Sequence, residues 1–171
     1  RQPCMELLEQ TARISADKLK FFRLAFGAAG GVVDMVAADE PRSLIDALVR
    51  NNDRVTINWA LGLAEMSKPA VKVLLNFAQL GIDALVRGGT LDIGMEMREG
   101  AAEIVVRATG PKIAFDPTIG KALDGSLPAD EVSSRTAAAH MLCLLAAQTG
   151  GGLQYALSED ALVLGAVLPE G

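Results

Sequence analysis

The chain has 171 residues, of which half are apolar and 22 % are charged, and its net charge is −5. This composition supplies enough apolar material for a globular core. The negative charge argues against a nucleic-acid partner, and no apolar run reaches the roughly 20 residues that cross a bilayer. Cys4 and Cys143 lie in apolar, helical contexts, which favours reduced thiols, so we expect a cytoplasmic protein.

The first 27 residues predict one long amphipathic helix. Its apolar stripe is broad enough to require helical partners on more than one side. We therefore expect a homodimer, and the dimer residues are Leu8, Leu19, Phe22 and Phe26. Four basic residues on this helix could bind an acidic partner or simply lie on a solvated face, and both readings remain open. They are Arg13, Lys18, Lys20 and Arg23.

Gly27–Gly31 predicts a boundary, and the rest of the chain alternates between short strands and helices. Gly94 interrupts one strand and predicts a bulge there. The pattern favours an α+β fold in which helices pack on a mixed, mainly antiparallel sheet. The expected strands are 32–37, 54–59, 91–97, 103–108, 153–157 and 161–168; the expected helices are 41–49, 68–87 and 130–148, the last capped by Asp130, with one helical turn near 118–123.

The stretch from Val73 to Thr90 carries the most specific signal in the chain. Lys68-Pro69 opens a helix in front of it, since proline is tolerated in a first turn, and Arg87-Gly88-Gly89 closes that helix. The letters resemble the N-box of sensor histidine kinases and related Bergerat-fold (GHKL) ATPases, because Asn76 and the glycine turn match. The asparagine that holds magnesium in those enzymes falls at Leu80, which has no lone pair for a hard cation.

Two further nucleotide motifs of these ATPases are altered. In the D-x-G-x-G turn, Gly110 is retained, but the adenine-binding aspartate becomes Ala108 and the second glycine becomes Lys112. The phosphate-binding G-x-G-x-G run has lost all three glycines, and a Cβ at each position obstructs the approach of phosphate to the backbone. The residues that replace them are Ser134, Thr136 and Ala138. We therefore expect no ATP, no metal and no other cofactor, and Asn76 becomes an ordinary hydrogen-bonding residue.

This combination resembles the histidine phosphotransferases of the ChpT type, which serve alphaproteobacterial phosphorelays. The run Leu19–Gly31 carries the resemblance along with the altered motifs. It implies a dimerising helical hairpin, of which residues 1–30 would be the second helix, followed by a degenerate kinase-like domain over 31–171. It also implies that receiver domains and a hybrid histidine kinase are partners, with the basic residues of the first helix facing the receivers.

The resemblance implies that the phosphoacceptor histidine lies on the first hairpin helix, upstream of Arg1, so no catalytic residue is expected within this chain. His140 is the sole histidine and falls in the last helix. In kinases of this fold, the residue at that position packs on the sheet. We interpret His140 as structural or solvent-facing. Two functions remain open: phosphoryl transfer between receiver aspartates, or a non-catalytic, dimeric module that binds response regulators and sequesters them.

Overall fold

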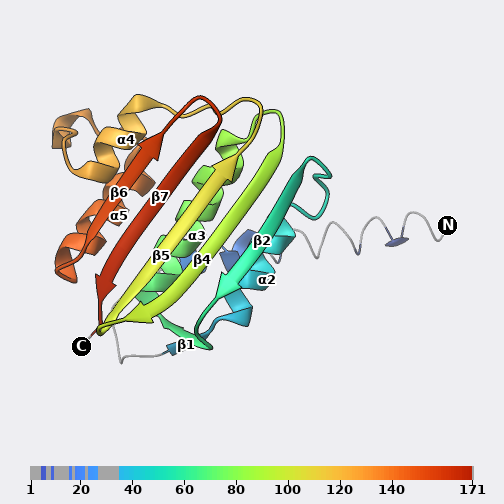
Figure 1. The fold of residues 1–171 in the computed structure, drawn as a ribbon, viewed down its shortest axis with the longest axis horizontal. Helices are drawn as coiled ribbons and strands as arrows, with labels where there is room; N and C mark the ends of the chain where they lie inside the picture. Colours follow the sequence, from blue (N-terminus) through green and yellow to red (C-terminus); the bar gives the residue numbers. More distant parts are fainter. Residues whose placement is uncertain are drawn as a thin grey trace.

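The computed structural model describes residues 5, 6, 9, 16, 18–21, 23–26 and 35–170. Its main sheet has five strands in the order β2-β4-β5-β7-β6 (Figure 1). Only β2 and β4 are parallel, and the other neighbours are antiparallel, as the sequence predicts. The strands are β2 (Val55–Leu61), β4 (Gly89–Arg98), β5 (Ala101–Thr109), β6 (Gly152–Leu157) and β7 (Ala161–Pro169).

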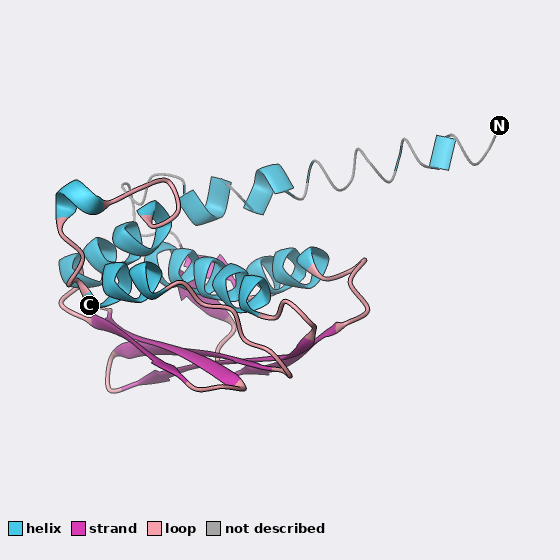
Figure 2. Cartoon of the chain, turned by 90° about the horizontal axis from the view of Figure 1, so that it is seen from above, coloured by secondary structure: helices cyan, strands magenta, loops and turns pink. Residues whose placement is uncertain are grey.

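Helices cover one face of this sheet, which gives a two-layer α+β sandwich (Figure 2). Alternate residues of the central strands point into the layer between sheet and helices, and in β5 these are Ala102, Ile104, Val106 and Ala108. Such alternation is expected when only one face of a sheet is buried. The described helices are α2 (Asp39–Leu48), α3 (Lys68–Ala84), α4 (Pro117–Asp124) and α5 (Ala137–Gln148), with a 3₁₀ turn, η1 (Ala129–Glu131).

Helix α3 lies at the centre of the helical layer and begins where the Lys68-Pro69 signal predicts. The hydroxyl of Ser67 accepts a hydrogen bond from the amide of Ala70, so the first turn is capped. Most of the helix is buried, because it packs against the sheet on one side and against α2 and α5 on the others. It ends at Ala84, three residues before the predicted end, and Leu85 follows as its C-cap.

Two predictions about the elements are wrong. The last helix begins at Ala137, and Asp130 lies in η1 and caps nothing, because residues 132–136 make a separate turn between the two. Gly94 lies in an unbroken antiparallel register opposite Val105, so β4 has no bulge there. A helix lies where the helical turn near 118–123 is predicted, and it is longer than expected, with eight residues in α4. Strand β3 (Glu65–Ser67), which pairs with β1 (Met35–Ala37), was not foreseen.

The described residues of the N-terminal segment are helical and lie on the outer side of the helical layer (Figure 2). Phe21 and Ala25 are buried in the same core as the α+β sandwich, whereas Leu19 is 60 % exposed and Phe26 is also exposed. Leu8, Phe22, Arg13, the Gly27–Gly31 boundary and the start of the first predicted strand lie outside the described residues. Within the described part of the chain, no helix has the length and apolarity needed to cross a membrane.

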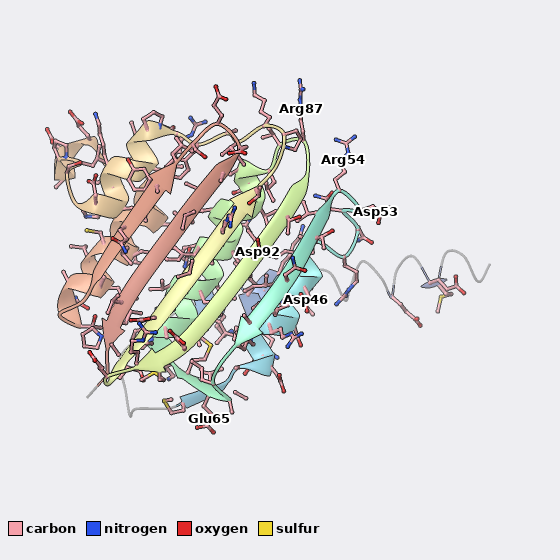
Figure 3. The ribbon with its side chains drawn as sticks, viewed as in Figure 1. Asp46, Asp53, Arg54, Glu65, Arg87 and Asp92 are labelled. Carbon is pink, nitrogen blue, oxygen red and sulfur yellow. The ribbon has the colours of Figure 1, made fainter. Side chains whose placement is uncertain are left out.

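The edge strand β2 is joined to its neighbours by side chains (Figure 3). The indole nitrogen of Trp59 donates to Asp46 of α2 at 2.9 Å, and the guanidinium of Arg42 lies 5.5 Å from the Trp59 ring centroid. The amide of Asn58 donates to Asp92 of β4 at 2.9 Å. These contacts link β2 to α2 on one side and to β4 on the other.

Candidate functional site

Asn76 occupies the position of an N-box asparagine, and its side chain donates hydrogen bonds to two backbone carbonyl oxygens. The amide nitrogen of Asn76 donates to the carbonyl oxygen of Lys72 at 2.8 Å and to that of Ala25 at 3.3 Å. The residue is 4 % exposed. The second bond joins α3 to the N-terminal helix, so this asparagine connects the two predicted domains. This bears out the interpretation of Asn76 as a hydrogen-bonding residue.

Apolar side chains stand at two further positions that match the nucleotide motifs of the ATPases. Leu80 packs against the hydrophobic core from one turn beyond Asn76. Ala108 of β5 is fully buried and lies between Leu91 of β4 and Leu162 of β7 in the register of the sheet. Neither position offers a group that could bind a metal ion or the amino group of a base.

The retained glycines pack against each other. Gly88 has φ +80°, which only glycine adopts without strain, and its amide donates to Leu85 at the end of α3. A Cβ at Gly110 would collide with the carbonyl oxygen of Gly88, and one at Gly89 would collide with that of Thr109. These three glycines are therefore explained by the close approach of two backbone turns, without any ligand.

The segment that aligns with the phosphate-binding run of the ATPases is held by its own side chains. The hydroxyl of Thr136 accepts from the amide of Ser133 at 2.9 Å, and the buried Thr136 closes a turn in front of α5. Arg135 pairs with Asp116 at 3.1 Å, and Asp116 also accepts from the amide and the hydroxyl of Thr118. The hydrogen bonds from Thr118, with a smaller contribution from Arg135, lower the pKa of the Asp116 carboxyl. Lys112 is exposed, and Ala138 follows in the first turn of α5.

The basic residues of the N-terminal helix remain on the surface where the structure describes them. Lys18 and Arg23 are exposed, and the ammonium of Lys20 lies 3.1 Å from the carboxylate of Glu40 at the start of α2. Because both partners of that pair are well exposed, the ion pair contributes little stability. It nevertheless adds a second connection between this helix and the sandwich.

His140 lies on α5 and is partly exposed. It lines a pocket between α5 and α3, whereas Ala139, Leu142 and Ala146 of the same helix are buried towards the core. The expectation that this residue packs on the sheet is therefore wrong, because it lies on the flank of α5 that faces α3. Among the described residues, no group of three His, Cys, Asp or Glu side chains is placed to hold a metal ion.

Sequence reasoning missed two features of this region. One is the hydrogen bond from Asn76 to the backbone carbonyl of Ala25, 51 residues away. Because every residue has a backbone carbonyl, the residue type at position 25 does not indicate this bond. Lys72 is nearly buried on a helix face where the apolar period alone would predict a hydrophobic residue.

The chain is similar to known phosphotransferases and kinases. Residues 38–161 match the protein family described as the histidine phosphotransferase C-terminal domain. The protein phosphotransferase ChpT of Brucella abortus (strain 2308) is 26 % identical over 160 residues, which cover 93 % of this chain and 76 % of that protein.

Solved structures share the fold. A bacterial phosphotransferase superposes with a TM-score of 0.78 at 24 % identity, over 96 % of this chain and 78 % of that one. The catalytic domain of the histidine kinase ThkA superposes with a TM-score of 0.59 at 15 % identity, over 82 % and 97 % respectively. The sandwich therefore has the fold of histidine-kinase catalytic domains, as the N-box resemblance predicts.

Proposed function

Since the chain belongs to the histidine phosphotransferase family, we propose that it relays a phosphoryl group between receiver-domain aspartates. Membership of this family supports a phosphorelay function in two-component signalling. The observation that carries this proposal is the match over residues 38–161, on a kinase-like sandwich whose nucleotide determinants are replaced. A kinase and response regulators follow as partners in general terms. We take the kinase to be a hybrid one that carries its own receiver.

The altered site supports relay rather than phosphorylation from ATP. Leu80 and Ala108 leave no ligand for magnesium or adenine, and the side chain of Asn76 is engaged with two carbonyl oxygens. In this proposal the phosphoryl group comes from an aspartyl phosphate. In that step a histidine ring nitrogen attacks phosphorus, the bond to the aspartate oxygen breaks, and the aspartate leaves as a carboxylate. Positioning and charge stabilisation dominate such reactions, and the receiver contributes the metal.

We place the two domains at residues 1–30 and 31–171, with the first contributing the dimer contact and the receiver surface. Leu19 and Phe26 are exposed in the single chain while Phe21 and Ala25 are buried, so the helix has one face on the sandwich and another available to a partner subunit. Exposed Lys18 and Arg23 supply positive charge for an acidic receiver, together with Lys20 and, in our proposal, Arg13.

The phosphoacceptor histidine belongs, in this proposal, on the helix that precedes Arg1. A phosphoacceptor needs a protruding position that a receiver pocket can enclose, and His140 instead lines a pocket between two helices. We therefore assign His140 no part in the transfer.

The test is phosphoryl transfer from a labelled receiver to the protein extended at its N-terminus through the preceding helix. We expect acid-labile label on that protein, and label that then passes to a second receiver. The His140→Gln variant should keep nearly all of the label, because its acceptor is elsewhere. Stable receiver binding without any label would favour sequestration instead, and loss of label in a folded His140→Gln variant would identify His140 as the acceptor.

A further inference from the structure

A pocket of about 370 Å³ lies between α3 and α5, which run side by side behind the sheet (Figure 1). One flank of α5 forms most of its wall at helical spacing, and Lys72 of α3 and Val132 of the preceding turn complete it. The residues of α5 that line it are Ala137, His140, Met141, Leu144, Leu145 and Gln148. A volume of this size, apolar walls and a few polar groups are typical of small-molecule sites in proteins.

Lys72 is the unusual member of this lining. The residue is 6 % exposed, and in the described part of the chain no acceptor or carboxylate partners its ammonium. Lysine is rarely buried to this extent, and partial loss of solvent around an ammonium favours an anionic partner. Burial lowers the pKa of Lys72 below its ordinary value, and the positive charge of Lys68 lowers it further. An anion in the pocket would relieve both effects.

The apolar part of the lining is also incompletely buried. Helix α5 has no charged residue besides the titratable His140, and a helix that is apolar on all sides is normally buried on all sides. Leu144 nevertheless remains 52 % exposed at the pocket, and Met141 beside it is only partly buried. A ligand with an apolar body would cover these two side chains.

We propose that this pocket binds a small organic anion that has one carboxylate and an apolar body. The carboxylate would pair with the ammonium of Lys72, with the amide of Gln148 as a further donor, and the body would lie along Met141 and Leu144. A single ammonium matches a singly charged carboxylate. A phosphate dianion would call for additional cations or a run of backbone amides. The proposal is independent of phosphoryl transfer.

The experiment titrates the chain with octanoate and, as a neutral analogue, octanamide, and follows binding by NMR chemical shifts and by the melting temperature. We expect saturable octanoate binding that perturbs α5 resonances, with octanamide at least tenfold weaker. Lys72→Met, which keeps the length of the side chain, should weaken octanoate at least tenfold and remove the preference over octanamide. Lys112→Met removes an exposed lysine and should leave octanoate binding unchanged.

A second variant covers the case in which Lys72→Met does not fold. Gln148→Glu places a carboxylate in the pocket. This carboxylate should compete with octanoate for Lys72 and weaken octanoate binding about tenfold. Equal binding of octanoate and octanamide to the unaltered chain would overturn the proposal, and so would equal losses in Lys72→Met and Lys112→Met. Tighter binding of octyl phosphate than of octanoate would overturn the assignment to carboxylates. If Lys72→Met impaired only a protein partner, with octanoate unbound, the pocket would be a protein contact and the proposal would be wrong.

Discussion

Replacing Asn76 tests whether its amide now fastens the N-terminal helix to α3. The amide nitrogen donates at 2.8 Å and 3.3 Å to two carbonyl oxygens, in a site that is 4 % exposed. A hydrogen bond of this kind contributes roughly 1 kcal/mol net, so Asn76→Ala should cost about 2 kcal/mol. Asn76→Asp keeps the shape but, when ionised, offers no donor and turns a negative charge towards the same two oxygens.

The cost of Asn76→Asp has a ceiling, because the introduced carboxyl can bind a proton instead. Holding a carboxyl with an ordinary pKa near 3.9 protonated at pH 7 costs about 4 kcal/mol. The protonated carboxyl has one donor for the two oxygens, so the lost second bond adds roughly 1 kcal/mol. We therefore expect about 5 kcal/mol of destabilisation at pH 7, more than twice that of Asn76→Ala. The folded state raises the pKa of this carboxyl above its unfolded value, so the penalty grows as pH rises from about 4 and shrinks as pH falls.

Urea unfolding at pH 4.5 and at pH 7, followed by circular dichroism, measures both predictions. Gln79→Ala is the matched control in the same helix, since its amide binds Asp83 at 3.0 Å on the exposed side, and it should change stability by less than about 0.5 kcal/mol. If Asn76→Asp were as stable as the unaltered chain at pH 7, the amide could not be the donor described above. An Asn76→Asp deficit that stays constant between the two pH values would refute the electrostatic part of the reasoning.

Three further predictions follow from the same geometry. Millimolar Mg-ATP should leave the melting temperature unchanged, and a clear rise would mean that nucleotide binds. Leu19→Glu, at a 60 % exposed position, should shift sedimentation from dimer to monomer without loss of the fold, whereas a monomeric unaltered chain would contradict the dimer. Asp116 has a lowered pKa, so its stabilisation is present above its ordinary pKa of 3.8 and is lost as pH falls below it. Asp116→Asn should therefore lower the free energy of unfolding, measured in urea, more at pH 6 than at pH 3.

Much of the fold could be read from local patterns. The Lys68-Pro69 start of α3, the alternation of β5 and the closing hairpin depend on residues near one another in the chain, and they lie where they were predicted. The start of α5 was missed because Asp130 is a good cap by residue type, yet Thr136 closes a separate turn through Ser133. A capping residue can begin a helix or a turn, and the contacts around it decide between these outcomes.

The sequence by itself determined which ligand groups are absent at the positions that resemble the nucleotide motifs. The side chains of Leu80 and Ala108 cannot bind a metal ion or accept a hydrogen bond, whatever surrounds them. Only the tertiary structure decided what those positions and their neighbours now do. Asn76 bonds to Ala25, 51 residues away, and Lys72 stays without a described partner in a pocket made by a different helix. Residue type fixes which bonds a side chain can make, whereas the acceptor within reach is set by long-range packing, which leaves no local pattern.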